Sequence, residues 1–187
     1  MTPWLTGLDT MILHDLYGIR SIAGTYFFIG VSEFATLYTL AAFSACSCLY
    51  FLLRKQYAYA VGLASTMALT GLVILYVKSA VALARPDMYY QAYVENGMTF
   101  PSGHAAGSMA FYGFLAYVAR REFSLDTSRF IILIVILLIG LIGFSRLYLG
   151  VHYFSDVAGG YALGALCNVA GIGICRLMNS TRLLANK

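Results

Sequence analysis

Charged side chains are scarce in this sequence. Of the 187 residues, only 11% are Asp, Glu, Lys or Arg, whereas 60% are hydrophobic. This composition lies far from that of an average soluble domain and indicates a polytopic membrane protein. The net charge is +4, but the cations occur in short clusters at the ends of apolar runs. That pattern is typical of membrane orientation signals, so we expect no nucleic-acid partner. The length fits one membrane-embedded domain over residues 1–187.

Disulfide and metal-site patterns are also missing. The four cysteines, Cys46, Cys48, Cys167 and Cys175, lie inside apolar runs at spacings that suit no metal site. We therefore expect them to be small buried hydrophobic side chains. No carboxylate cluster stands out as a cation site, and no low-complexity segment is present. Residues 1–20 lack the continuous apolar core of a cleavable signal peptide.

Apolar runs dominate what is present, and five of them are long enough to cross a bilayer as helices, which takes about 20 residues each. They lie near residues 26–53, 57–84, 102–120, 129–147 and 152–177. Residues 1–25 carry charges and predict an interfacial segment rather than a span. The expected fold class is all-α: a polytopic transmembrane helix bundle with five spans plus an N-terminal interfacial helix. Gly160 and Gly164 have the spacing of a close helix–helix contact.

Three short polar motifs interrupt these apolar runs. They are residues 78–86 (KSAVALARP), 101–104 (PSGH) and 145–156 (SRLYLGVHYFSD). Charged groups at membrane depth are costly, so they usually mark a functional site. The first motif ends the second span, the second begins the third, and the third joins the fourth to the fifth. Alternate crossing therefore brings all three motifs to the same membrane face.

The opposite face carries most of the remaining cations. They are Arg54, Lys55, Arg120, Arg121, Arg129, Arg176, Arg182 and Lys187. On the motif face, Arg20 is the only cation outside the motifs. The positive-inside rule makes the cation-rich face cytoplasmic. We therefore expect a multi-pass protein of the plasma (inner) membrane, with its motifs on the extracytoplasmic side.

The first motif places two cations two helical turns apart. Lys78 and Arg85 would project from one face of a helix. Arg offers a planar fork and Lys a point charge, so the pair suits an anion with several oxygens. The alternative is that both side chains reach towards lipid head groups.

The second motif predicts the start of a helix. Free N–H groups at a helix N-terminus form an anion site, and the Ser102 hydroxyl adds a donor. Gly103 lets the backbone approach a ligand closely. His104 follows at a position from which it could give a proton. The alternative is an ordinary helix cap with an incidental histidine.

The third motif contains a histidine and a carboxylate four residues apart. On a helix, His152 and Asp156 would be neighbours. A carboxylate bonded to one ring nitrogen fixes the tautomer and leaves the other nitrogen free as a nucleophile. Arg146 lies across a short turn and could reach the same anion. The alternative is a buried structural pair.

Together the motifs resemble the signature of the type 2 phosphatidic acid phosphatase family, the membrane branch related to bacterial acid phosphatases and vanadium haloperoxidases. Lys-x6-Arg-Pro, Pro-Ser-Gly-His and Ser-Arg-x5-His-x3-Asp are matched at every defining position. The resemblance implies that His152 attacks phosphorus and forms a phosphohistidine, that Asp156 orients it, and that His104 protonates the leaving oxygen and then activates water. It assigns the phosphoryl oxygens to Lys78, Arg85, Ser102, Gly103 and Arg146. It implies no metal and no other cofactor.

The resemblance implies an integral-membrane lipid phosphatase whose partner is a phosphorylated membrane lipid. Undecaprenyl diphosphate is the first expectation, and phosphatidylglycerol phosphate, phosphatidic acid and lipid A are further substrates of the family. A phosphotransferase with a lipid or sugar acceptor, or a non-catalytic lipid binder or transporter, are the alternatives. Many membrane members have three spans before the first motif, whereas this sequence has two and the interfacial segment.

Glu33 is an acidic residue inside the first predicted span. A carboxylate there needs a partner or water. It either reaches the membrane interface or pairs with Lys78 or Arg85.

Overall fold

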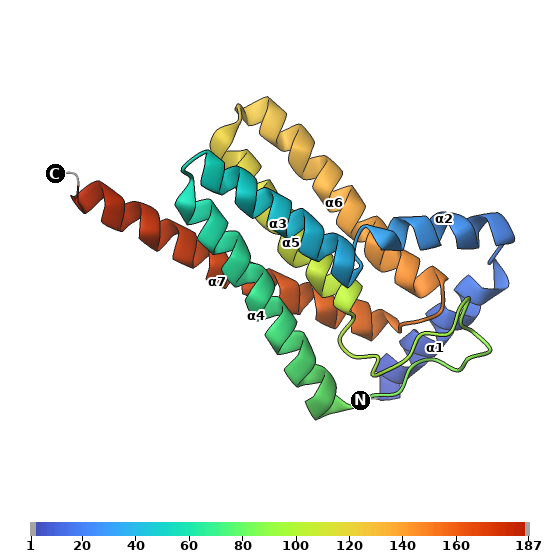
Figure 1. Ribbon diagram of the computed structural model, residues 1–187. Coiled ribbons are helices and arrows are strands. Elements are labelled where there is room, and N and C mark those ends of the chain that lie inside the picture. The colour runs from blue at the N-terminus through green and yellow to red at the C-terminus, as the bar shows by residue number, and fades with distance from the viewer. Residues whose placement is uncertain (1–2, 186–187) are drawn as a thin grey trace.

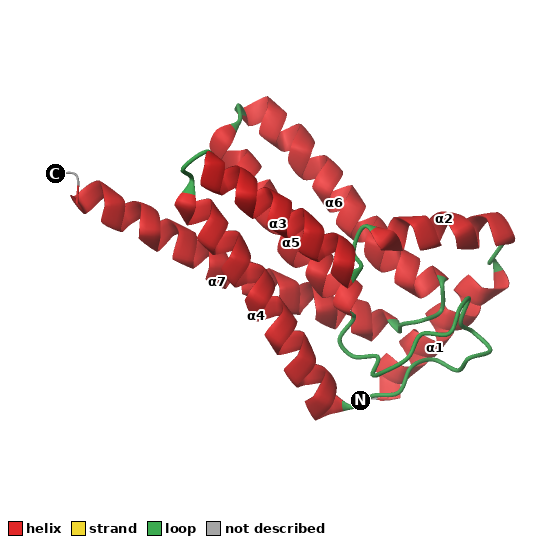
Figure 2. Ribbon diagram, viewed as in Figure 1, coloured by secondary structure: helices red, strands yellow, loops and turns green. Residues whose placement is uncertain are grey.

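The computed structural model describes residues 3–185, with side chains for residues 6–180. Over this range all regular secondary structure is helical (Figures 1 and 2). The helices are α1 (Pro3–Gly18), α2 (Ile22–Glu33), α3 (Leu37–Leu53), α4 (Tyr57–Val81), α5 (Gly103–Glu122), α6 (Leu125–Tyr148) and α7 (Phe154–Ala185). The expected all-α fold class is confirmed for these residues.

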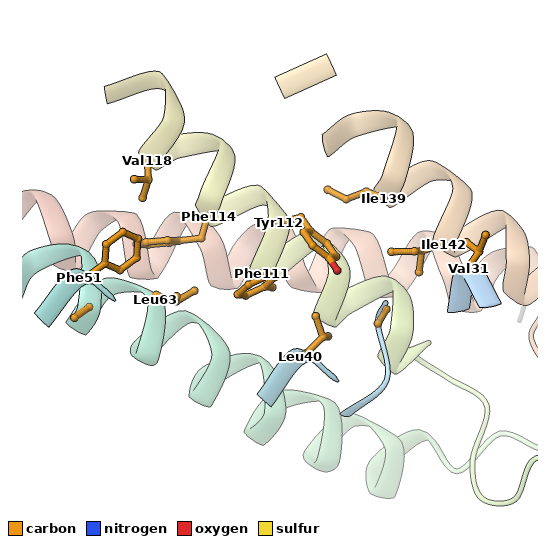
Figure 3. Close-up of a cluster of buried hydrophobic side chains, with 12 residues drawn as sticks. Val31, Leu40, Phe51, Leu63, Phe111, Tyr112, Phe114, Val118, Ile139 and Ile142 are labelled. Atoms are coloured by element: carbon orange, nitrogen blue, oxygen red, sulfur yellow. The ribbon is translucent and has the colours of Figure 1, made fainter. Parts of the chain in front are cut away.

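Helix α5 lies at the centre of the bundle, in contact with α3, α4, α6 and α7. Phe111 and Phe114 from α5 pack with Leu63 of α4 and Ile142 of α6 in the main hydrophobic core, which Figure 3 shows in close-up. All four side chains are almost completely buried. Between helices in a bilayer, such side chains stabilise the bundle by close van der Waals packing, because the lipid tails are as apolar as they are. This packing fixes α5, and with it the PSGH motif at its start.

Two glycines let α7 approach α5 closely. A Cβ atom on Gly160 would lie 2.6 Å from the carbonyl oxygen of Ser102, and one on Gly164 would lie 2.4 Å from that of Ala106. Side chains at these positions would push the helices apart, so the predicted close helix contact is confirmed. It brings the start of α5 against the first turns of α7.

Four apolar segments are long and apolar enough to cross a membrane within the described range. They are Ile22–Leu53, Tyr57–Val81, Leu125–Tyr148 and Phe154–Ser180. Helix α5 is not among them, although it was predicted as a span. It is rich in small and polar residues, and about half of its residues are buried by neighbouring helices. A helix shielded in this way needs fewer lipid-compatible side chains than one that faces the bilayer.

The first predicted span, residues 26–53, is interrupted, which corrects the expectation of one continuous helix. Helix α2 ends at Glu33, and the Thr36 hydroxyl caps α3 by accepting from the Thr39 N–H. The Tyr112 hydroxyl donates to the Phe34 carbonyl at 2.7 Å and so satisfies a backbone group that the break leaves free. The two halves pack differently, with α2 on α6 and α3 on α4 and α5.

Helix α1 rests against α6 and α7 at the end of the bundle where α7 begins. Asp9 is buried, and its carboxylate accepts from the Ser155 N–H at 2.9 Å and from the Ser155 hydroxyl at 2.6 Å. A carboxylate is favourable at a helix N-terminus because it satisfies free N–H groups and the helix dipole. This contact ties the N-terminal helix to the segment that carries the third motif.

Candidate active site

The two cations of the first motif both bind carbonyl groups of the loop of residues 82–102, but they do not lie on one helix. Helix α4 ends at Val81, and Ala82 adopts a left-handed conformation with φ of 47°. Arg85 therefore lies in the loop, and the expected two-turn spacing on a helix is wrong. Lys78 Nζ donates to the Met98 carbonyl at 2.5 Å, and Arg85 Nε donates to the Gly97 carbonyl at 3.2 Å.

The second motif begins α5, as predicted. Ser102 is buried and is the N-cap residue, and its hydroxyl oxygen accepts from the Ala105 N–H at 3.5 Å. Its own N–H donates to the Asp156 backbone carbonyl at 3.0 Å, which joins the second motif to the third. A Cβ on Gly103 would meet open space. The backbone at Gly103 therefore leaves room for a ligand at the helix N-terminus.

His104 is half-buried in the first turn of α5. The charges of Arg146, Arg85 and Lys78 act on its ring. The ring makes no hydrogen bond to any described residue, so both nitrogens are available for proton transfer. This position is compatible with the expected role of an acid and base.

The third motif is arranged around His152, which lies in the loop between α6 and α7. It precedes the first residue of α7, Phe154, so the expectation that His152 and Asp156 share a helix is wrong. The turn still brings them together, with Nδ1 of His152 3.4 Å from Oδ2 of Asp156. On the other side of the ring, Nε2 lies 3.3 Å from Nη1 of Arg85. One ring nitrogen thus faces a carboxylate and the other faces a cation.

Thr99 is a third member of this arrangement that the sequence did not reveal. Its hydroxyl lies 2.5 Å from Oδ2 of Asp156 and 3.1 Å from Nδ1 of His152, and the side chain is almost fully buried. The Tyr153 N–H also donates to Asp156 Oδ2 at 2.8 Å. The carboxylate is therefore fixed by several donors and can hold the imidazole in one orientation.

Glu95 is the second residue that sequence reasoning missed. One carboxylate oxygen accepts from Arg85 Nη2 at 3.1 Å, and the other accepts from Arg146 Nη2. Arg146 is fully buried, and its Nη1 donates to the Tyr93 hydroxyl at 2.7 Å. Glu33, which was considered as a partner for Lys78 or Arg85, is instead exposed at the end of α2. Glu95 thus takes the place that was considered for Glu33.

Burial and neighbouring charges set the protonation of two groups in these loops. Burial lowers the pKa of His152 to about 4, and the cations Arg146 and Arg85 act in the same direction, while Asp156 opposes them. Burial raises the pKa of Glu95, but Arg146 and Arg85 outweigh burial and hold that pKa below its ordinary value. At neutral pH the imidazole of His152 is therefore uncharged and Glu95 is a carboxylate.

The geometry brings all the predicted site residues to one end of the bundle. Lys78, Arg85 and Arg146 lie near enough to His104, in the first turn of α5, for their charges to act on its ring, and Arg85 also lies beside His152. Such an arrangement can bind a phosphoryl group and attack it with nitrogen. Within the described residues, no group of three His, Cys, Asp or Glu side chains could hold a metal ion.

Thr99 and Glu95 could not be found from the sequence because both lie in a loop with no periodic pattern. Thr99 stands two residues before Pro101, close enough to the second motif to be a candidate. Glu95 is one of several acidic residues on that face. Figure 1 shows the loop passing close to α1 and the adjoining helix ends. Only this path of the loop distinguishes Glu95 from the other acidic residues.

Comparison with known proteins gives a family match over more than half of the chain. The family model of the PAP2 superfamily matches residues 59–174. Phosphatidylglycerophosphatase B of Bacillus subtilis (strain 168) is 35% identical over 91 residues, which are 48% of this chain and 44% of that protein. The matched part is thus less than half of the relative's length.

Two solved structures share the fold. The crystal structure of a transmembrane PAP2-type phosphatidylglycerolphosphate phosphatase from Bacillus subtilis has a TM-score of 0.84 at 24% identity, covering 92% of this chain and 86% of that one. Aquifex aeolicus LpxE has a TM-score of 0.73 at 21% identity, covering 89% and 95%. At these identities the likeness concerns the fold.

Proposed function

The chain belongs to the PAP2 superfamily, and from this we propose that it is an integral-membrane phosphatase that removes the terminal phosphate of a phosphorylated membrane lipid. The observation that carries the proposal is the setting of His152. Its Nδ1 is held by Thr99 and Asp156, while its Nε2 faces the Arg85 guanidinium. An oriented, neutral imidazole beside a cation is suited to attack a phosphoryl group.

In the proposed first step, Nε2 of His152 attacks phosphorus. The N–P bond forms, the ester P–O bond breaks, and the lipid oxygen leaves with the electron pair and takes a proton from His104. In the second step, water gives a proton to His104 and its oxygen bonds to phosphorus. The N–P bond then breaks, its electron pair returns to Nε2, and inorganic phosphate leaves. Asp156 orients the imidazole in both steps.

We assign the binding of the phosphoryl oxygens to five residues of the three motifs. They are Lys78, Arg85, Ser102, Gly103 and Arg146. Donors that are already positioned stabilise the negative charge that develops in the transition state without further reorganisation. In this proposal the cations of the chain itself meet that charge, and catalysis requires no metal ion.

Phosphatidylglycerol phosphate is the first substrate to test, because the Bacillus subtilis relatives are named for it. Undecaprenyl diphosphate was the first expectation from the sequence, but it receives no specific support from the comparisons. It is therefore the second substrate to test. Both present a terminal phosphate on an apolar anchor, so the same site chemistry could serve either.

We further propose five crossings, formed by α2–α3, α4, α5, α6 and α7, with α1 at the interface. Helix α5 has 20 residues and runs beside α4, α6 and α7, which supports its role as the fifth crossing. The cation-rich ends lie opposite the site. By the positive-inside rule, the site then faces the extracytoplasmic side of the plasma membrane.

The experiment that tests the function is phosphate release by the purified protein in detergent. The panel contains phosphatidylglycerol phosphate, undecaprenyl diphosphate, phosphatidic acid and lipid A, with and without an added acceptor lipid. Release of inorganic phosphate from at least one lipid supports the proposal. Phosphate found only on the acceptor would identify a phosphotransferase, and no reaction with any lipid would overturn the enzyme assignment.

A further inference from the structure

Glu95 joins the two guanidinium groups of the site. Its Oε1 accepts from Arg85 Nη2, and its Oε2 accepts from Arg146 Nη2. The Tyr93 hydroxyl completes the contact, since it lies 3.3 Å from Glu95 Oε2 and accepts from Arg146 Nη1. Arg85 and Arg146 come from different segments of the chain. One carboxylate therefore fixes the relative position of two cations that would otherwise repel each other.

The bonds to Glu95 use only one edge of each guanidinium group. In Arg85, Nη1 donates to the Val151 carbonyl at 2.9 Å and lies 3.3 Å from the His152 ring, and Nε donates to the Gly97 carbonyl at 3.2 Å. In Arg146, Nε is buried and has no hydrogen-bond partner within the described residues. A buried donor without a partner is costly unless a ligand or water satisfies it. The Nε of Arg146 is thus the donor left for an anion, and Nη1 of Arg85 lies beside His152, while Glu95 fixes Nη2 of both arginines.

We propose that Glu95 is a positioning residue that orients Arg85 and Arg146 for the phosphoryl group, and that it stays in place when the phosphoryl group binds. This inference rests on the proposed function, because it assigns the two arginines to the phosphoryl oxygens. Glu95 does not touch the substrate and acts through the guanidinium groups. Tyr93 supports Arg146 in the same way.

Charge and geometry give opposite expectations for the loss of Glu95. By Coulomb's law, removing a negative charge near the site would strengthen the binding of an anion. The same result would follow if Glu95 occupied the phosphate position and had to be displaced. If Glu95 instead positions the arginines, its loss lets them separate and weakens anion binding. The sign of the change in affinity therefore decides between the two.

The test is calorimetric titration of inorganic phosphate into the detergent-solubilised protein at pH 7.5. The variants are Glu95→Gln, Glu95→Asp and Tyr93→Phe, and the matched control is Glu33→Gln, an exposed carboxylate on α2. Charge-assisted hydrogen bonds of this kind are worth enough for Glu95→Gln to weaken phosphate binding by about tenfold or more. Glu95→Asp keeps the charge but is one methylene too short to bridge both guanidinium groups, so it should also weaken binding. Tyr93→Phe should weaken it by less, and Glu33→Gln should leave it unchanged.

Tighter phosphate binding in Glu95→Gln would overturn the proposal, and so would wild-type affinity in Glu95→Asp. If Glu95→Gln does not fold, Tyr93→Phe decides in the same way, with unchanged or tighter binding counting against the proposal. Thermal unfolding in the same detergent distinguishes the positioning role of Glu95 from a purely structural one. A purely structural role would lower the melting temperature and leave the phosphate affinity of the folded protein unchanged.

Turnover gives a second readout. Positioning predicts that Glu95→Gln raises KM and lowers kcat for a lipid phosphomonoester, whereas displacement predicts a lower KM. Phosphate binding is measured without turnover. The positioning role of Glu95 can therefore be refuted even if the wild-type protein hydrolyses lipids. Conversely, if the wild-type protein binds phosphate in a way that depends on Glu95 but hydrolyses no lipid, only the proposed function is refuted.

Discussion

The Thr99 hydroxyl lies 2.5 Å from Asp156 Oδ2 and 3.1 Å from Nδ1 of His152. A carboxylate oxygen accepts, so the Thr99 hydroxyl gives its hydrogen to Asp156. Its oxygen can then accept only from the imidazole, which places the ring proton on Nδ1. The lone pair of His152 is consequently on Nε2, the nitrogen that faces Arg85.

Replacing Thr99 with valine should lower kcat. Valine has a similar shape but no hydroxyl, so His152 loses an acceptor and Asp156 loses a donor. Hydrogen bonds to charged groups are worth about 1.5–3 kcal/mol, which corresponds to about tenfold or more in rate. Thr99→Ser keeps the hydroxyl and should retain most of the activity. Equal activity of the valine variant and the wild type would show that Asp156 alone orients the ring.

Replacing His152 with alanine should abolish phosphate release, since no other group can take its place at the centre of the site. The variant should still insert and show wild-type helical circular dichroism. His104→Ala should slow both steps and, with an activated leaving group that needs no proton, should accumulate a phosphohistidine detectable by acid-labile labelling. Phosphate release near the wild-type rate by folded His152→Ala would refute the assignment of the nucleophile.

The imidazole of His152 should titrate near pH 4, where burial and the neighbouring cations place its pKa. The ordinary pKa of histidine is higher, about 6.5, so the unfolded chain takes up this proton first as the pH falls. The contribution of His152 to stability is therefore full above about pH 6.5 and is lost between that value and about pH 4. The chain has three histidines, so NMR of labelled histidine, assigned by replacing His14 and His104, measures this titration directly. A His152 ring that titrates near pH 6.5 would contradict the buried setting.

Chelation should leave activity intact, because the proposed site meets phosphoryl charge with Lys78, Arg85 and Arg146. Phosphate release is measured before and after dialysis against EDTA, with and without added Mg²⁺. Orthovanadate, which adopts the trigonal-bipyramidal geometry of phosphoryl transfer, should inhibit. Loss of activity in EDTA that Mg²⁺ restores would show that a metal ion takes part.

Labelling of introduced cysteines should place the site outside the cytoplasm. In a cysteine-free background, Met88→Cys lies in the site loop and Asp126→Cys lies at the start of α6, at the opposite end of the bundle. Both positions are well exposed, with 65% of Met88 and 98% of the Asp126 side chain accessible. An impermeant thiol reagent should modify only Met88→Cys in intact cells, after permeabilisation of any outer membrane. Modification of Asp126→Cys alone would reverse the proposed orientation.

The sequence by itself determined the class of fold and the end of the bundle at which the polar motifs meet. Apolar length predicts spans because backbone groups in lipid must be bonded within a helix. Alternate crossing of the predicted spans then predicts that Lys78, Ser102 and His152 meet at one face without any tertiary information. The spacing of Gly160 and Gly164 likewise predicted a close contact, because small residues are what allow two helices to approach.

Only the tertiary structure decided how the loops complete the site. The sequence placed Arg85 and His152 on helices, whereas both lie in loops, because Ala82 ends α4 in a left-handed turn and α7 begins only at Phe154. It also could not show the break at Phe34, which is stable because the Tyr112 hydroxyl reaches the free carbonyl from another helix. Thr99 and Glu95 owe their partners to the path of an aperiodic loop. Such contacts depend on distances between segments far apart in the chain, and no local pattern of residues encodes them.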